Sequence, residues 1–484
     1  MCGIVAYVGS RRAYPILIKG LQRLEYRGYD SAGIALITDD NNSIVTYKQA
    51  GKVSDLLEFI GDNDTNGSIG IGHTRWATHG PPNQINSHPH SSSDGSFSLI
   101  HNGIIENYSS LKKVLEEKGY IFKSDTDSEV LMYLIECVYK TQLKESKDIC
   151  GDLFYDSIRI ALNEVVGAYA IVVIDKNNSE EFYAARKGSP LVIGIGNNEY
   201  FVASDASPII EYTDKVIYLK DGEVARLNKN QEVEIKTIDN KKESPDIQKL
   251  EQSIESIEKG GYDHFMLKEI FEQPKSIIDT LRGRINPKTN DIVLGGVKDY
   301  ESKISNADRL IIIACGTSWH AGLIGEYLIE DLARINVEVE YASEFRYKNP
   351  IVTNKDIVIA ISQSGETADT LAALEIAKEN GALTLGICNV VGSSITRTTS
   401  GGTYTHAGPE IGVASTKAFT TQVTVLLLFA LRFSQLRKTV DRENYDFLIN
   451  ELNAVPERIN QVLNLNDSIE KIALKFKDAS NFLY

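Results

Sequence analysis

The sequence predicts a mixed α/β protein of more than one domain, whose C-terminal half is a doubly wound parallel sheet. The chain has 484 residues, more than one hydrophobic core usually holds, so we expect two to four domains. Its first residues form an apolar strand directly behind a cysteine. From about Asp308, a strand, a hydroxyl-rich turn and a helix follow one another and then recur, as in parallel sheets with helices on both faces.

Composition limits the partners and the compartment. The formal net charge is −15 without an offsetting basic stripe, which argues against a nucleic-acid or membrane-surface partner. The longest apolar run, residues 425–431, is far shorter than a membrane span. We therefore expect a cytoplasmic protein. The cysteines are odd in number, widely spaced and without CxxC pairs, which disfavours disulfides and structural zinc; they are Cys2, Cys137, Cys150, Cys315 and Cys388.

Cys2 follows the initiator methionine. Once Met1 is removed, its thiol and α-amine belong to one residue, with ordinary pKa values of ~8.5 and ~7.7–8.0. The amine then accepts the thiol proton and the thiolate attacks a carbonyl. The alternative is that Cys2 only opens a buried strand, because residues 4–8 are mostly apolar. A helix is predicted over residues 14–24, and a strand over residues 34–37 follows a Gly-rich, charged loop.

Residues 70–80 place an arginine, a tryptophan, two threonines and two histidines between glycines. Arg75 offers a planar fork suited to a substrate carboxylate, and Trp76 suits a lid. His88, His90 and His101 lie nearby in sequence, so a metal site has to be considered. No HExxH spacing or acidic partner accompanies these histidines, and we expect no metal.

Asn102 and Gly103 follow a predicted strand over residues 97–100. An Asn-Gly pair between apolar runs is first of all a hairpin turn. The functional interpretation is an oxyanion hole made by the Asn102 side chain and the Gly103 N–H. Asp127 precedes an apolar helix over residues 130–138. It is either part of a helix cap or a partner for a substrate ammonium.

These motifs resemble the N-terminal-nucleophile glutaminase domain, a layered αββα fold, over residues 1–235. The resemblance rests on residues 2–4, 25–30, 73–80, 102–104 and 124–129. It implies that Cys2 is the nucleophile, that Asn102 and Gly103 form the oxyanion hole, and that the glutamine site comprises Arg27, Arg75, Trp76, Thr78, His79 and Asp127. It also implies strands at residues 168–175, 181–186, 190–196 and 200–204, and residues 216–227 are expected to form a closing hairpin.

Residues 236–295 are predicted as a linker. The composition turns polar and charged from about Asn228 to Ser256, and a short helix is expected within residues 260–274.

The second architecture occupies residues 296–438. Strands are predicted at residues 310–314, 356–361 and 383–388, with helices at residues 319–334 and 368–380. Ligands bind at the carboxyl ends of such strands, and helix N-termini with hydroxyl groups favour phosphate. No nucleotide P-loop is present. If the hydroxyls were only helix caps, one per turn would suffice, but Ser362, Ser364 and Thr367 share one turn.

This half resembles the sugar isomerase (SIS) domain. By that resemblance the sugar-phosphate contacts are Thr317, Ser318, Ser362, Gln363, Ser364, Thr367 and Ser415. The two halves in this order resemble the glutamine:fructose-6-phosphate amidotransferases (isomerizing), or glucosamine-6-phosphate synthases, in their bacterial form. The implied reaction uses ammonia from glutamine to aminate fructose-6-phosphate and isomerises it to glucosamine-6-phosphate. The implied partners are these two substrates and a second subunit, as a homodimer, with no cofactor.

Three alternatives were considered. An asparagine synthetase needs an ATP-binding loop, which Gly401, Gly402 and the Thr403 after them do not provide. A phosphoribosyl amidotransferase needs a diphosphate loop with paired acids, which we do not find. A regulatory sugar-phosphate-binding protein with a vestigial glutaminase is disfavoured because the nucleophile and its expected partners are all present.

Residues 463–484 resemble the start of a second sugar isomerase domain. A helix is expected over residues 467–477 and a strand from residue 479, in the order that also opens the first lobe. A lone helix and strand leave their apolar face uncovered, so we expect this end to be frayed or the sequence to be a fragment. A 484-residue chain would then hydrolyse glutamine without making glucosamine-6-phosphate.

Overall fold

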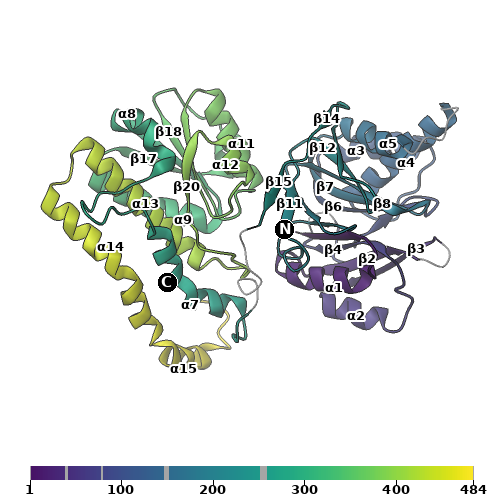
Figure 1. The fold of residues 1–484 in the computed structure, drawn as a ribbon, viewed down its shortest axis with the longest axis horizontal. Helices are drawn as coiled ribbons and strands as arrows, with labels where there is room; N and C mark the ends of the chain where they lie inside the picture. Colours follow the sequence, from purple (N-terminus) through teal and green to yellow (C-terminus); the bar gives the residue numbers. More distant parts are fainter. Residues whose placement is uncertain (1, 39–41, 78–79, 146–151, 251–258, 483–484) are drawn as a thin grey trace. The chain divides into compact units, whose positions relative to one another are not determined.

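The computed structural model describes residues 2–38, 42–77, 80–145, 152–250 and 259–482. The chain divides into two compact units, residues 1–257 and 258–484 (Figure 1). Each unit has its own layers and its own cores.

Unit 1 contains two antiparallel sheets packed face to face. The first has the order β15-β11-β9-β10-β1-β4-β2-β3 and the second β14-β13-β12-β8-β7-β6-β5. The strands of the first are β1 (Gly3–Val8), β2 (Ser31–Ile37), β3 (Ile44–Ala50), β4 (Ile69–Arg75), β9 (Val192–Ile195), β10 (Tyr200–Ala203), β11 (Lys215–Tyr218) and β15 (Ile247–Lys249). Those of the second are β5 (His90–Ser91), β6 (Phe97–Ile105), β7 (Gly167–Asp175), β8 (Asn178–Lys187), β12 (Glu223–Asn228), β13 (Glu234–Thr237) and β14 (Lys242–Glu243).

Alternation along the strands explains the layers. In β1, Ile4, Ala6 and Val8 face the core between the sheets, whereas Val5 and Tyr7 face the outer helix layer. Helices cover both outer faces and complete the predicted αββα arrangement. One layer holds α1 (Ala13–Leu24) and α2 (Val53–Ile60), and the other holds α3 (Tyr108–Glu117), α4 (Asp127–Glu145) and α5 (Asp152–Asn163).

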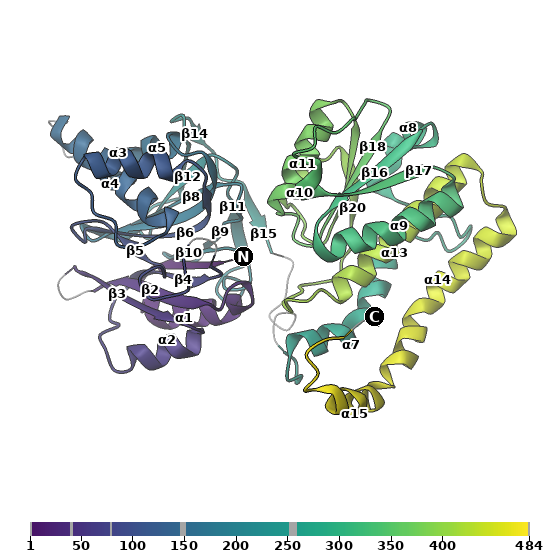
Figure 2. The same cartoon turned by 180° about the vertical axis from the view of Figure 1, so that it is seen from behind.

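Unit 2 is built on a five-stranded parallel sheet of order β17-β16-β18-β19-β20. Helices pack on both faces, as expected for a doubly wound sheet (Figure 2). The strands are β16 (Arg309–Ala314), β17 (Asn336–Tyr341), β18 (Ile357–Ser362), β19 (Leu383–Cys388) and β20 (Gly401–Tyr404). The helices are α7 (Phe265–Leu281), α8 (Glu301–Ser305), α9 (Gly316–Ala333), α10 (Ala342–Phe345), α11 (Ala368–Glu379), α12 (Ser394–Thr398), α13 (Lys417–Arg437), α14 (Arg442–Leu463) and α15 (Asn466–Phe476).

Helix α13 lies in the core of unit 2. Among the described residues it is the helix long and apolar enough to cross a membrane, with a mean hydropathy of 1.3, but 61% of its apolar window is buried. Val425, Leu426 and Phe429 pack in the same core as the strand residues Leu310 and Ile312. Its apolar character is therefore explained by packing within the protein.

Two predicted turns differ from the structure. Residues 216–227 do not form a hairpin, because β11 pairs with β9 and β15 in the first sheet while β12 pairs with β8 and β13 in the second. The tight turn between Lys220 and Glu223 exists, but it carries the chain from one sheet to the other. Asn102 and Gly103 do not form a turn either, since β6 continues through both of them and pairs with β7.

The predicted linker carries structure. β13 pairs with β12, β14 with β13, and β15 with β11, so residues 234–249 extend the sheets of unit 1. Helix α7 has 17 residues and packs in unit 2, which is longer than the short helix expected there. At the other end, α15 confirms the predicted helix, and its residues are exposed. Residues 479–482 form no strand.

Candidate active sites

Cys2 lies at the start of β1, against the loop that follows β4. Its Sγ accepts a hydrogen bond from the Trp76 N–H at 3.2 Å and donates to the Trp76 carbonyl at 3.4 Å. The next residue, Gly3, lies close to β4, because a Cβ there would lie 2.6 Å from Thr74 Oγ1. Burial raises the pKa of the Cys2 thiol, although the Trp76 N–H and the charges of Arg75 and Arg27 oppose the rise. The thiol therefore needs a base to become the nucleophile.

Two side chains hold the Cys2 carbonyl oxygen. Asn102 Nδ2 donates to it at 3.0 Å, and Arg27 Nε donates at 3.4 Å. Arg27 also pairs with Asp205 at 2.8 Å, and its side chain is 9% exposed. Burial would raise the pKa of Asp205, but the Arg27 charge and the hydrogen bonds from Tyr26 and Ser207 together hold that pKa below its usual range. Arg27, expected in the glutamine site, thus lies beneath the backbone of the nucleophile.

His73 fixes the orientation of the Asn102 amide. His73 Nε2 lies 2.9 Å from Asn102 Oδ1 and 3.1 Å from the His101 carbonyl oxygen. Both are acceptors, so we assign the proton to Nε2. Burial lowers the pKa of His73 to about 3, so the ring is neutral at physiological pH. Asn102 Oδ1 must accept, and its Nδ2 then donates to Cys2 and, at 3.0 Å, to Ser204 Oγ.

Arg75 and Asp127 are buried groups of opposite charge that interact with each other. Both are buried, and the Arg75 guanidinium donates to the carbonyls of Gly80 and Pro81. Burial lowers the pKa of Arg75, and the nearby Cys2, Asp30 and Asp127 counteract this. Asp127 Oδ2 accepts the Ile105 N–H at 2.8 Å. The two charged groups expected at the amino-acid end of glutamine therefore interact electrostatically with each other.

The remaining predicted residues differ in position. Trp76 is 42% exposed and meets Tyr29 edge-on, with ring centroids 5.2 Å apart, so its indole is accessible from solvent. Gly103 has φ +139°, and a Cβ there would lie 2.0 Å from the Ala168 carbonyl oxygen, so only glycine fits. Thr78 and His79 lie outside the described residues.

The histidines considered as metal ligands pack into a buried stack. His88 stacks on His73 with centroids 4.1 Å apart and meets His90 edge-on at 4.8 Å. Burial lowers the pKa of His88 and His90 well below the usual value. Protein groups bind a ring nitrogen of each: the His101 N–H binds His88, Thr126 binds His90, and Ser128 binds His101. Within the described ranges no group of three metal-binding side chains occurs.

A second candidate site lies at the carboxyl edge of the parallel sheet in unit 2. Residues 362–367 connect β18 to α11. Ser362 Oγ accepts the Gly365 N–H at 3.0 Å and lies 3.0 Å from Thr367 Oγ1, while Ser364 Oγ accepts the Glu366 N–H at 3.2 Å. The Glu366 carboxylate accepts from the Ser394 N–H and hydroxyl at 2.8 and 2.7 Å, which anchors the loop to α12. The Gln363 backbone carbonyl accepts the Asn389 N–H at 3.2 Å.

The other predicted sugar contacts come from α9 and from the loop before α13. Thr317 and Ser415 line one cavity of about 530 Å³ together with His320, Leu323, Ile324 and Phe419. Ser318 is buried and accepts from Gln422 Nε2 at 3.0 Å. The structure thus joins Thr317 to Ser415, while residues 362–367 do not line that cavity.

Comparisons with known proteins identify a domain family in each unit. Residues 73–211 match the glutamine amidotransferase domain model, and residues 303–432 match the SIS domain model. The chain is 57% identical to the glutamine--fructose-6-phosphate aminotransferase (isomerizing) of Bacteroides thetaiotaomicron over 484 residues, which is 100% of this chain and 77% of that protein. It is 53% identical to the enzyme of the same name from Chlorobaculum tepidum, with the same coverage. The chain belongs to the glutamine--fructose-6-phosphate aminotransferase (isomerizing) family.

A solved structure of the same family is also similar. The C-terminal domain of glucosamine-fructose-6-phosphate aminotransferase from Francisella tularensis is 38% identical and covers 46% of this chain and 62% of that chain, with a TM-score of 0.44. The family models and the curated relatives confirm the resemblance to this family and the glutaminase and doubly wound architectures.

Several residues that support the two candidate sites of this aminotransferase were not predicted from the sequence. In unit 2, Glu269 and Glu272 of α7 bind the loop before α13. Glu269 accepts the N–H groups of Ile411 and Gly412 at 2.5 and 3.0 Å, and Glu272 pairs with the buried Lys417 at 2.7 Å. The sequence signal was two glutamates three residues apart on one predicted helix, which lie on the same helical face, and a lysine at the start of another apolar helix.

In unit 1 the missed residues are His73, Ser204 and Asp205. Ser204 Oγ accepts a hydrogen bond from the Ile4 N–H at 2.8 Å, although the two residues are 200 positions apart in the sequence. Local patterns give no sign of such a contact.

Proposed function

We propose that this chain acts as a glutamine--fructose-6-phosphate aminotransferase (isomerizing), with glutamine hydrolysed at Cys2 and the ammonia used at a sugar-phosphate site in unit 2. Glutamine hydrolysis at Cys2 is supported by the position of the Asn102 amide. Neutral His73 orients this amide, and its Nδ2 lies 3.0 Å from the Cys2 carbonyl oxygen. The family membership supports the use of ammonia at a sugar-phosphate site. The alternative of a regulatory protein without synthase activity is not favoured.

The glutaminase step follows from these positions. The α-amine of Cys2, free after removal of Met1, takes the thiol proton. The sulfur attacks the side-chain carbonyl of glutamine, and the oxyanion receives hydrogen bonds from Asn102 Nδ2 and the Gly103 N–H. The carbon–nitrogen bond then breaks, and the proton leaves with ammonia. Water hydrolyses the thioester, which releases glutamate and restores the thiol.

Charge complementarity supports the orientation of glutamine. Arg75 binds the α-carboxylate and Asp127 the ammonium, because each provides the opposite charge in a buried pocket. Trp76, exposed beside Cys2, covers the site, and we assign Thr78 and His79 to its rim.

The sugar-phosphate site uses the hydroxyl groups at the edge of the sheet. Ser362, Ser364 and Thr367 bind the phosphate at the start of α11, where unpaired N–H groups and the helix dipole favour an anion. Thr317, Ser318, Gln363 and Ser415 contact the sugar.

The protein is also proposed to be a cytoplasmic homodimer without nucleic-acid or membrane partners. The net charge of −15 supports the lack of a nucleic-acid partner. Ile324 and Tyr327 of α9, 39% and 76% exposed, offer apolar surface for a second subunit. Light scattering of the purified chain measures the mass, and a monomer at micromolar concentration contradicts the dimer.

The test of the glutaminase step is glutamate release. The Cys2→Ala variant should lose it, whereas Cys315→Ala and Cys388→Ala should keep it, because both of these cysteines belong to unit 2. Retention of Met1, checked by intact mass, should also abolish it, since the α-amine is then an amide. Persistent glutamate release by Cys2→Ala would exclude Cys2 as the nucleophile.

A further inference from the structure

Lys118 and Cys137 bring an amine and a thiol together on the outer helix layer of unit 1. Lys118 Nζ lies 3.3 Å from Cys137 Sγ. Cys137 belongs to α4 and is 8% exposed, in an apolar cluster with Leu115, Val130 and Tyr133. The pair takes no part in the proposed glutaminase step, and the similarity to known proteins assigns it no role.

The surrounding structure holds the two groups in place. Lys118 ends α3, and its N–H donates to the carbonyls of residues 114 and 115 in the last turn. Gly119, at φ +91°, then reverses the chain. The Tyr120 hydroxyl also hydrogen-bonds the Cys137 sulfur, and burial, with the charges of Glu136 and Cys137, raises the pKa of that phenol. The sulfur therefore contacts two polar groups from the segment that follows α3, and the lysine reaches it from the exposed side.

A lysine amine and a cysteine thiol at this distance can form a covalent product that neither group forms alone. Peroxide oxidises a thiolate to a sulfenic acid, which condenses with a nearby thiol or nitrogen. Among the cysteines that the structure describes Cys137 forms no disulfide, and the nitrogen that hydrogen-bonds its sulfur is Lys118 Nζ. We propose that Lys118 and Cys137 form a covalent nitrogen–sulfur cross-link when the protein is exposed to peroxide.

The chemistry balances with peroxide as the only oxidant. One hydrogen peroxide converts the thiol to a sulfenic acid and water. The Lys118 amine then attacks sulfur, the sulfur–oxygen bond breaks, and a second water leaves with the amine proton, so an S–N bond remains. With two equivalents of peroxide the bridge retains one oxygen as S–O–N, and three waters are released. Both products join the same two residues.

The cross-link would close a ring around part of the proposed glutamine site. Residues 119–136 include the loop 124–129, whose Glu129 carboxylate accepts the N–H groups of Lys123 and Ser124. Asp127, at the start of α4, lies in the same ring. A bridge from Lys118 to Cys137 therefore ties both ends of the segment that carries Asp127, and it connects an oxidant signal to that segment.

The experiment is peroxide treatment of the whole protein followed by trypsin and mass spectrometry. The expected result is one peptide that contains both residues, lighter by about 2 Da for S–N or heavier by about 14 Da for S–O–N, and uncleaved after Lys118. Dithiothreitol should restore the two normal peptides. If Cys137 gains only about 32 or 48 Da, as a sulfinic or sulfonic acid, and trypsin still cleaves after Lys118, the proposal is overturned.

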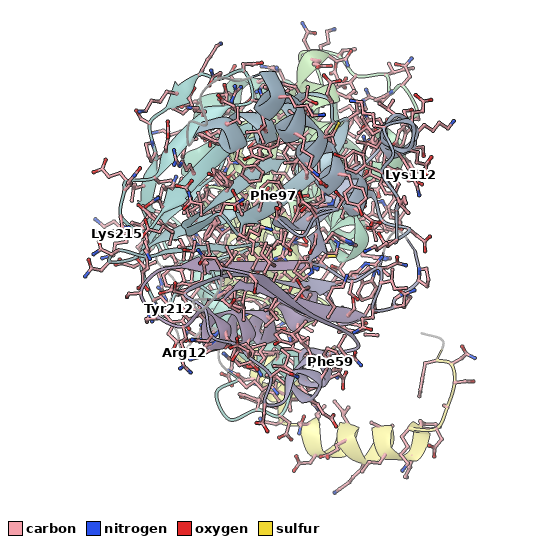
Figure 3. All side chains as sticks on the ribbon, turned by 90° about the vertical axis from the view of Figure 1, so that its right-hand side faces the viewer. Arg12, Phe59, Phe97, Lys112, Tyr212 and Lys215 are labelled. Carbon is pink, nitrogen blue, oxygen red and sulfur yellow. The ribbon has the colours of Figure 1, made fainter. Side chains whose placement is uncertain are left out.

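Matched variants make the result specific. Lys118→Arg keeps the positive charge but has no amine to condense, so the linked peptide should vanish and Cys137 should oxidise further. Lys112, which is labelled in Figure 3, lies on the same helix and has its amine over the Phe122 ring; Lys112→Arg should keep the link. Cys315, a half-buried thiol of unit 2, reports the oxidant dose in the same sample. A linked peptide that survives in Lys118→Arg would assign the bridge to another residue.

Discussion

The Asn102 side-chain amide is one of the two hydrogen-bond donors that we assign to the oxyanion hole. Replacement by alanine removes Nδ2, which now donates to the Cys2 carbonyl, so kcat for glutamine hydrolysis should fall by about 10²–10³ with a smaller change in KM. Asn107→Ala is the matched control, because that amide binds the Glu164 carbonyl and lies outside the pocket. The measurement is steady-state glutamate release. An unchanged kcat in Asn102→Ala would remove Asn102 from the mechanism.

His73 makes the stability of unit 1 depend on pH. Its pKa is about 3 in the folded protein and ~6.5 in the unfolded chain, so between these values the unfolded state binds more protons. The contribution of neutral His73 is complete above pH ~6.5 and is lost on acidification, by at most ~1.4 kcal/mol per pH unit. His73→Gln should therefore lose less stability between pH 7.5 and pH 5 than the parent protein does.

Urea unfolding at the two pH values measures this difference. His320→Gln, which changes an exposed histidine of unit 2, serves as the control and should behave like the parent. Equal losses in the parent and in His73→Gln would show that His73 does not titrate between the two states as proposed.

Among the helices and strands, those that show a clear local pattern of apolar residues were predicted from the sequence. The apolar periodicity of residues 14–24 and 368–380 predicted α1 and α11 almost to the residue. The hairpin predicted over residues 216–227 is wrong. The turn is encoded locally, whereas the sheet that each strand joins depends on pairing partners elsewhere in the chain, such as β15 for β11 and β8 for β12. Asn102 and Gly103 were assigned to an oxyanion hole from a local motif, whereas the contacts of Ser204 with Asn102 and of Asp205 with Arg27, 102 and 178 residues apart in sequence, leave no local signal.

The loop between β18 and α11 is the element whose proposed role is tested most directly. Inorganic phosphate should raise the Tm of unit 2 by ligand linkage, by the equivalent of ~2.7 kcal/mol at one hundred times Kd. Ser364→Ala should reduce that shift, because its hydroxyl now caps only the Glu366 N–H and is available to an anion. Thr398→Ala is the control, since its hydroxyl binds a carbonyl inside α12. Equal shifts in the parent protein and in Ser364→Ala would place phosphate elsewhere.

At the scale of the whole molecule, the cores predict how the chain unfolds. Among the described residues, each hydrophobic core draws on one unit alone: four cores lie between residues 4 and 250, and two between residues 292 and 452. Units with separate cores unfold as separate cooperative transitions. Calorimetry should therefore resolve two transitions. An electrophilic glutamine analogue that reacts with Cys2 should raise only the one belonging to residues 1–257, and phosphate only the other.

Two matched samples assign the transitions. In Cys2→Ala the analogue should shift neither transition while phosphate still shifts one, and in Ser364→Ala the phosphate shift should shrink while the analogue still acts. A single transition that both ligands raise together would mean that the two units unfold as one, and that the separation of their cores does not determine the cooperativity of the chain.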